Sequence, residues 1–278
     1  MKRGYLIFCT LLALCLLGVC LPAAAERLEV VFLDAGKADA FILFTGNSTV
    51  VIDTGKDKMG KKMVEFLQER GIERIDAMFI THFDKDHVGG ADSLLEKLPV
   101  SVVYEPSYFS DGKQYLQYRE ALDAAQVRNV RLTENLSFEL DGVSYRVDVA
   151  NKEDYGVDEE NDFSLVISVT YGQTSFLFAG DAENARLGEL LAEGNLAHDV
   201  LKAPHHGAAE KLSAAFFAAV NPKYAVITSD EEKPEDPGVV QALQDLGTEV
   251  YLTRLGGVAC VSDGETLTFS QLPLDSVK

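Results

Sequence analysis

One run of ten residues, positions 81–90 (THFDKDHVGG), holds four side chains that can bind a metal ion. His82 and Asp84 lie two positions apart, so both can project to the same side of an extended segment. Asp86 and His87 are adjacent and must diverge, which suits a second ion beside the first. Imidazole and carboxylate ligands suit zinc, manganese or iron. Four candidate ligands within six residues therefore predict a metal site, rather than a solvated acidic turn.

The elements on either side of this run predict how it is positioned. Residues 75–80 are almost wholly apolar and indicate a buried strand. After Gly89-Gly90, apolar residues recur at helical spacing over 91–98. The candidate ligands are thus expected on a strand-to-helix turn, where helix N–H groups point at whatever binds.

The first 25 residues have the pattern of a signal peptide. Lys2 and Arg3 precede an apolar stretch over 5–21, and Ala23-Ala24-Ala25 predicts cleavage before Glu26. The alternatives are an uncleaved membrane anchor, because the apolar stretch is long, and a lipoprotein modified at Cys20. The predicted organisation is a signal peptide over 1–25 and one domain over 26–278.

The cysteine content and the charge narrow the functional classes. After cleavage only Cys260 remains, in a strand-like run, so we expect a buried core thiol and neither a disulfide nor a cysteine zinc cage. The whole chain carries 25 Lys and Arg against 44 Asp and Glu, a net charge of −19. This charge argues against a broad basic surface for nucleic acid or anionic lipid, although bound metal and a few local lysines can offset it at a site. Beyond the leader, no apolar run is long enough to span a bilayer.

One pattern occurs twice along the chain. A turn, an apolar strand and a terminal aspartate run from Gly46 to Asp53 and again from Gly172 to Asp181, and a helical pattern follows each. The alternative is a chance likeness of two hairpins. The repetition predicts two related halves with polar groups at matching strand ends, and the alternation of hairpins with helices predicts a mixed α and β fold. Four of the five histidines fall in two clusters, the run at 81–90 and Pro204-His205-His206-Gly207.

The run at 81–90 resembles the His-x-His-x-Asp-His motif of the metallo-β-lactamase superfamily. It has the His-x-Asp-x-Asp-His form found in the extracytoplasmic hydrolase domain of ComEC-type competence proteins and in their stand-alone relatives. Further segments are similar to that family: FLDAG at 32–36, IDTG at 52–55, NDFSLV at 161–166, FAGD at 178–181 and LKAPHHG at 201–207. The resemblance extends from about residue 28 to past residue 246. It implies an αββα four-layer sandwich built from two pseudo-related halves.

The resemblance also implies a ligand set for two divalent ions, zinc or manganese. The expected ligands are His82 and Asp84 for the first ion, Asp86, His87 and His206 for the second, and Asp181 as a bridge. His205 would then face the substrate.

Other residues are expected to assist. Asp84 or Asp86, if not fully engaged as a ligand, could accept a proton from water. Lys202 could stabilise an anionic transition state, the alternative being a surface lysine. Asp53 would support the site from a neighbouring strand end, and Asn161 and Asp162 would either contribute to the site or cap a loop.

Three departures from the family pattern bear on function. Asp84 replaces a histidine of the wider motif, which makes manganese a rival to zinc. The segment GKADA at 36–40 keeps Asp39 but loses a glycine of the family pattern. Near the C-terminus, residues 234–237 lack the histidine that the family carries before proline, so Asp236 must substitute for it or the activity is altered.

The expected function is a secreted metallohydrolase that cleaves phosphoester or phosphodiester bonds with a metal-bound hydroxide. It would be membrane-anchored instead if the signal were retained. The candidate substrates are a small-molecule or cell-surface phosphoester and extracellular nucleic acid. Acidic stretches at 158–162 and 230–236 favour the smaller substrate. The alternatives are a carbonyl hydrolase such as a lactonase and a non-catalytic metal-binding surface protein. The sequence does not indicate an oligomeric state.

Overall fold

A computed structural model describes residues 27–156 and 160–273. The signal peptide expected over 1–25 lies outside the described residues. Within the described ranges, no helix has the length and apolar character that crossing a membrane requires.

The first of two sheets has eight strands in the order β15-β14-β1-β2-β3-β4-β5-β6. Strands β3 to β6 run parallel, and the other neighbours are antiparallel. Strand β1 lies between β2 and β14, with Leu28 opposite Ser262 and Phe32 opposite Val258. The strands are β1 (Leu28–Phe32), β2 (Ala40–Phe44), β3 (Thr49–Thr54), β4 (Ala77–Phe79), β5 (Val102–Pro106), β6 (Arg128–Leu132), β14 (Val258–Ser262) and β15 (Leu267–Gln271).

The second sheet has seven strands in the order β13-β12-β11-β10-β9-β8-β7. Its strands are β7 (Leu136–Leu140), β8 (Val143–Asp148), β9 (Val166–Tyr171), β10 (Thr174–Phe178), β11 (Val200–Lys202), β12 (Tyr224–Ile227) and β13 (Glu249–Leu252). Here too a hairpin, β9-β10, leads into a parallel series that continues through β13. The succession β2 to β6 is thus repeated by β9 to β13, which confirms the two related halves.

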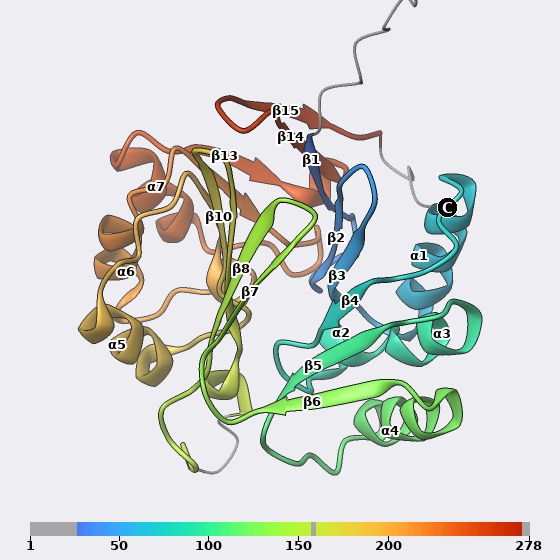
Figure 1. The fold of residues 1–278 in the computed structure, drawn as a ribbon. Helices are drawn as coiled ribbons and strands as arrows, with labels where there is room; N and C mark the ends of the chain where they lie inside the picture. Colours follow the sequence, from blue (N-terminus) through green and yellow to red (C-terminus); the bar gives the residue numbers. More distant parts are fainter. Residues whose placement is uncertain (1–26, 157–159, 274–278) are drawn as a thin grey trace, which may run out of the picture.

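Helices cover the outer face of each sheet, as Figure 1 shows. On the first sheet lie α1 (Asp57–Glu69), the short α2 (Lys85–Val88), α3 (Ala91–Lys97) and α4 (Lys113–Ala125). On the second lie α5 (Asn184–Glu193), α6 (Ser213–Val220) and α7 (Pro237–Asp245). The 3-10 turns are η1 (Glu160–Phe163), η2 (Pro204–Gly207) and η3 (Thr253–Leu255). The αββα sandwich is therefore confirmed.

The core has three apolar layers, one between the sheets and one beneath each set of helices. Strand β1 shows why: Val30 and Phe32 face the other sheet, whereas Val31 faces the helices. Because both faces are covered, strands such as β2 are apolar throughout instead of alternating. Cys260 is buried in the layer between the sheets, and burial raises the pKa of its thiol to about 12. This confirms the expected core thiol.

Helix α1 packs backbone against backbone on Gly90, the last residue of the run at 81–90. A Cβ at Gly60 would lie 2.7 Å from the Cα of Gly90 and would overlap the carbonyl oxygen of Gly90. Only glycine permits this approach, which holds α1 against the turn that carries His87.

We therefore expect Gly60→Ala to lower the free energy of unfolding by about 3 kcal/mol, because a buried backbone contact cannot make room for a methyl group. Chemical denaturation measures the change. Gly46→Ala is the control, since a Cβ at Gly46 meets no heavy atom within 4 Å. Equal stability of the two variants would contradict the prediction.

Candidate metal centre

The candidate site gathers at the strand ends of both sheets. Asp181 follows β10, His206 lies in η2 after β11, and His87 lies in α2 after β4. Asp39 immediately precedes β2. All four residues are buried, and one donor atom from each lies within 4.8 Å of the others. The two halves of the fold thus meet at this cluster.

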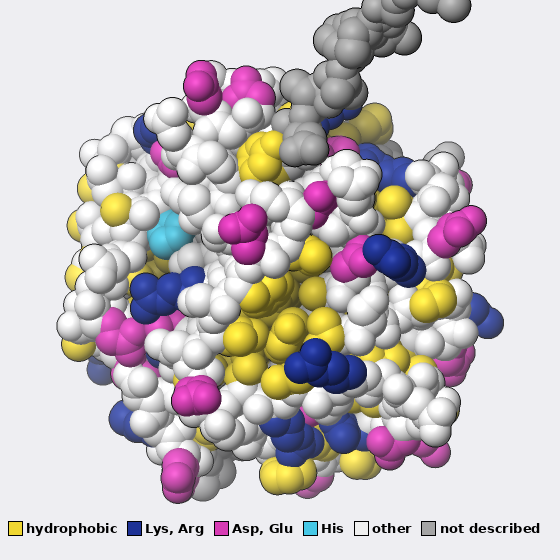
Figure 2. Space-filling view, viewed as in Figure 1, with side chains coloured by type: hydrophobic (Ala, Val, Ile, Leu, Met, Phe, Trp, Pro, Cys, Tyr) yellow, Lys and Arg dark blue, Asp and Glu magenta, His cyan; other side chains and the backbone are white. Residues whose placement is uncertain are grey.

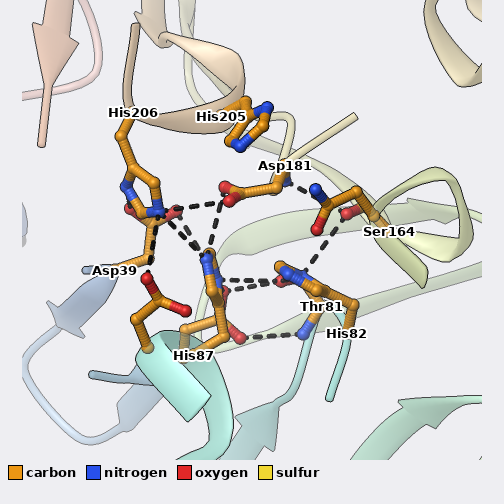
Figure 3. A network of polar contacts seen from close by, with 12 residues as sticks. Asp39, Thr81, His82, His87, Ser164, Asp181, His205 and His206 are labelled. Carbon is orange, nitrogen blue, oxygen red and sulfur yellow. Dashed lines mark hydrogen bonds and ion pairs between the residues drawn. The ribbon is translucent and has the colours of Figure 1, made fainter. Parts of the chain in front are cut away.

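Two imidazoles and one carboxylate face each other in the middle of the cluster (Figure 3). The Nε2 atoms of His87 and His206 are 3.4 Å apart. Asp181 lies beside both: Oδ1 is 3.3 Å from His87 Nε2, and Oδ2 is 3.1 Å from His206 Nε2. Burial alone would raise the pKa of Asp181, but His206, His87 and Lys202 outweigh it and hold that pKa well below its usual value.

The opposite nitrogens of both rings are held by supporting residues. His87 Nδ1 is 2.8 Å from Asp53 Oδ2, a carboxylate that can only accept when ionised. His206 Nδ1 is 2.9 Å from the hydroxyl of Thr228, which itself donates to Asp39 Oδ1 at 2.7 Å. Both Nδ1 atoms are therefore donors, and in the neutral rings both Nε2 lone pairs point into the centre. This is how proteins orient histidine ligands.

His82 adds a third imidazole with a free nitrogen. Its ring centroid is 4.0 Å from that of His87, and its Nε2 is buried with no hydrogen-bond partner. Burial, followed by the charge of His87, lowers the pKa of His82 well below its usual value, so the ring is neutral. A buried nitrogen without a partner costs free energy, which a metal ion would remove.

The donor set fits a divalent cation. It offers imidazole nitrogens and carboxylate oxygens, which suit zinc and manganese. Burial lowers the pKa of His87 and His206, but nearby carboxylates, Asp181 foremost, outweigh it and raise both pKa values. Metal binding would displace these protons, as it does at other histidine sites.

Asp39 received no role from sequence reasoning. Its nearest imidazole nitrogens are the Nδ1 atoms, at 3.3 Å for His206 and 3.8 Å for His87. It therefore contacts the rings on their Nδ1 side and supports them as Asp53 does, while it shares the ammonium of Lys202 with Asp181. The sequence offered one indication that Asp39 belongs to the site: it lies in the GKADA segment, where the family pattern also has an aspartate.

Lys202 is fully buried, so the alternative of a surface lysine is wrong. Its Nζ pairs with Asp39, donates to the carbonyl of Gly180 at 3.0 Å and lies 3.5 Å from Asp181 Oδ1. Burial alone would lower the pKa of this ammonium, but Asp39 and Asp181 outweigh burial and raise it. These contacts hold two carboxylates in place, and the expected role of Lys202 in stabilising an anionic transition state stays a prediction.

Asp84, Asp86 and His205 lie at the rim of the cluster. Asp86 Oδ2 is 4.0 Å from His206 Nε2. Asp84 is half-buried, and burial raises the pKa of its carboxyl group. His205 Nδ1 is 3.2 Å from Glu183 Oε1, and 23% of its side chain is exposed. None of the three is among the four clustered residues, and their expected roles stay predictions.

The backbone of η2 separates the two adjacent histidines. His205, His206 and Gly207 have φ values of 48°, 53° and 76°, all in the left-handed region. Two consecutive non-glycine residues in this region cost free energy, and such strain gathers at functional sites. The result is that the His206 ring enters the centre while the His205 ring faces the rim (Figure 3).

Three weaker candidates have structural roles. Asp162 accepts hydrogen bonds from the backbone N–H groups of Glu183 and Arg186, both at 3.0 Å, and so caps α5. The amide of Asn161 donates to Glu183 Oε1 at 2.8 Å. Asp236 is exposed and caps α7 by accepting from Gly238 N at 2.7 Å. The contacts of Asp162 correspond to the capping alternative, and the expected substitution of Asp236 for the family's histidine stays a prediction.

The sequence matches the profile of the metallo-beta-lactamase superfamily over residues 33–228, which contain every clustered residue. The chain belongs to this superfamily. ComE operon protein 3 of Bacillus subtilis is 29% identical over 278 residues, which cover 90% of this chain and 34% of that protein. Recombination protein 2 of Haemophilus influenzae is 27% identical over 211 residues, which cover 74% and 25%. The chain thus spans a quarter to a third of these relatives.

A solved structure agrees with this assignment. The metallo-beta-lactamase fold protein YhfI of Bacillus subtilis superposes with a TM-score of 0.55, covering 88% of this chain and all of its own, at 9% identity. This similarity shows the superfamily fold. The resemblance to ComEC-type competence proteins is confirmed by the curated relatives.

Proposed function

We propose that the protein is an extracytoplasmic, metal-dependent hydrolase of phosphoester or phosphodiester bonds. The observation that carries the proposal is the buried convergence of His87 Nε2, His206 Nε2 and Asp181, with His82 Nε2 unpaired beside them. Rings whose Nδ1 atoms are already engaged present their lone pairs for coordination.

Each residue has a role in this proposal. His82 and Asp84 would hold one ion, Asp86, His87 and His206 a second, and Asp181 would lie between them. The ions, zinc or manganese, would supply an activated water and offset charge developing on a phosphoryl oxygen. Asp53, Thr228 and Asp39 keep the rings oriented. The half-buried Asp84, whose pKa burial raises, is placed to accept a proton at the rim.

Two observations favour a phosphoester over a carbonyl substrate. The carboxylate at Asp84 makes the first ion site harder than a third histidine would, which suits a phosphoryl oxygen. One relative is named for recombination, and recombination acts on DNA, whose backbone consists of phosphodiesters. The leader-like residues 2–25 support an extracytoplasmic location.

Turnover of bis-p-nitrophenyl phosphate tests the proposal. Dialysis against a chelator should abolish turnover, and adding back Zn²⁺ or Mn²⁺ should restore it, with elemental analysis giving close to two ions per chain. A lactone and a β-lactam serve as comparison substrates in the same metal.

Two outcomes would oppose the proposal. Turnover of the lactone without turnover of the diester would identify a carbonyl hydrolase. Stoichiometric metal binding without turnover of any ester would identify a metal-binding protein that does not catalyse.

A further inference from the structure

A cavity of about 640 Å³ lies beyond the ends of strands β1 and β3 and is lined by four lysines, Lys56, Lys58, Lys62 and Lys85. Its other charged lining residues are Asp34 and Asp57. The cavity is distinct from the cluster of histidines, none of which lines it.

The segments that line the cavity are bonded to those that carry the metal centre. Lys56 follows Gly55, whose N–H donates to the Asp39 carbonyl at 2.7 Å. Asp39 N donates in turn to the carbonyl of Asp86 at 3.0 Å, and Lys85 precedes Asp86 in α2. These backbone hydrogen bonds therefore connect the segments that line the cavity with the segments that carry the candidate metal ligands.

The four lysines are available to a ligand. Among the ion pairs between described residues, none involves Lys56, Lys58, Lys62 or Lys85, whereas Lys202 and Lys223 are both paired. Four lysines against two carboxylates, Asp34 and Asp57, give this cavity a local excess of positive charge, which contrasts with the net charge of −19 of the chain. Figure 2 shows acidic and basic side chains interspersed on one face, so the negative charge of the chain is not spread evenly over that surface.

The first turn of α1 adds to the positive electrostatic potential of the cavity. Lys56 is the N-cap residue and makes no side-chain cap, so the first N–H groups of this 13-residue helix lack a side-chain acceptor. Lys58 and Lys62 are four positions apart and share a helix face. Helix N–H groups and several ammonium groups together favour an anion over any other ligand.

We propose that this cavity is a second phosphate-binding subsite, so that the substrate carries a phosphate group beyond the one attacked at the metal centre. The proposal rests on the proposed function and narrows its substrate class. It would favour a substrate with more than one phosphate, whereas the acidic stretches alone led us to expect a smaller substrate. The further phosphate could belong to a small bisphosphate or to the next links of a phosphodiester strand, and both present the same chemistry.

A matched pair of chromogenic esters tests the subsite. Thymidine 5′-(p-nitrophenyl phosphate) carries one phosphate, and the same ester with a 3′-phosphate carries two. We expect the second phosphate to lower KM about tenfold, as charged hydrogen bonds of ordinary strength would. In Lys58→Gln/Lys62→Gln this advantage should disappear, while KM for the one-phosphate ester stays unchanged.

Lys61→Gln/Lys97→Gln is the control, because it removes the same charge from exposed helix positions outside the cavity. It should keep the tenfold advantage. Short oligothymidylates of increasing length distinguish the two sources: an advantage already present with two phosphates indicates a small bisphosphate or strand end, and one that appears only in longer oligomers indicates a strand. Absence of any lysine-dependent advantage at every length would overturn the proposal.

The proposed phosphate subsite can be tested even if the proposed catalytic function is wrong. If no ester is turned over, calorimetric binding of thymidine 3′,5′-bisphosphate and of the oligomers to the metal-loaded protein still reports on the lysines. Binding weakened about tenfold in Lys58→Gln/Lys62→Gln, and not in the control, would support the subsite even then. Equal binding to all three proteins would refute it.

Discussion

Asp181→Asn is expected to lower turnover on the order of a thousandfold and to reduce the metal content by at least one ion per chain. Asp181 is the carboxylate that lies beside both His87 Nε2 and His206 Nε2, so its loss removes negative charge where two ions would share a ligand. An amide keeps the shape of the side chain but cannot balance two cations. Elemental analysis and turnover of bis-p-nitrophenyl phosphate measure the two effects.

Asp199→Asn is the matched control for this change. Asp199 precedes β11 and accepts from Ser175 N, whereas His206 follows the same strand, so the control alters a carboxylate at the opposite strand end. It should retain wild-type metal content and turnover. An Asp181→Asn variant that keeps both would mean that the convergence of donor atoms is not a metal centre.

Lys202→Met is expected to destabilise the metal-free protein by about 3–5 kcal/mol, because removing one partner of a buried ion pair leaves uncompensated charge. The ammonium is fully buried between the carboxylates of Asp39 and Asp181. Denaturant unfolding in the presence of a chelator measures the loss.

Metal should reduce this loss. An ion bound by Asp181 would supply positive charge beside the same carboxylates, so the difference between Lys202→Met and wild type should shrink when Zn²⁺ is present. Lys223→Met is the control: it breaks an ion pair with Asp199 in which the lysine is 73% exposed, and it should change stability far less than Lys202→Met, with or without metal. Equal losses for Lys202→Met in both conditions would contradict the proposed proximity to the ion.

The local pattern of apolar and polar residues was sufficient to predict much of the fold. The apolar run before His82 became β4, and the helical spacing after Gly90 became α3. The two similar hairpins became the matching parts of two sheets, because each local signal agreed with its tertiary surroundings. The separate helical turn α2 was not expected, since four residues are too few for a periodic signal.

The supporting part of the site was harder to predict, because its contacts join distant positions. Thr228 and Asp39 are 189 residues apart in the chain and become partners only when the sheets pack. Lys202 is buried only because two carboxylates from separate segments surround it, whereas an isolated lysine is ordinarily exposed. For Asp162 the choice between a site role and a cap depends on a helix end that spacing alone does not locate.

The position of β1 between β2 and β14 has a consequence for the order in which the chain can fold. One edge of strand β1 pairs with residues 258–262, which are synthesised more than 200 positions after it. Until that segment emerges, an apolar strand presents unpaired N–H and C=O groups that invite pairing with another chain. Such non-local closure is slow, because a large loop must be ordered before its contacts form. The candidate metal ligands all precede residue 258, so the candidate centre can be fully synthesised while the first sheet remains open.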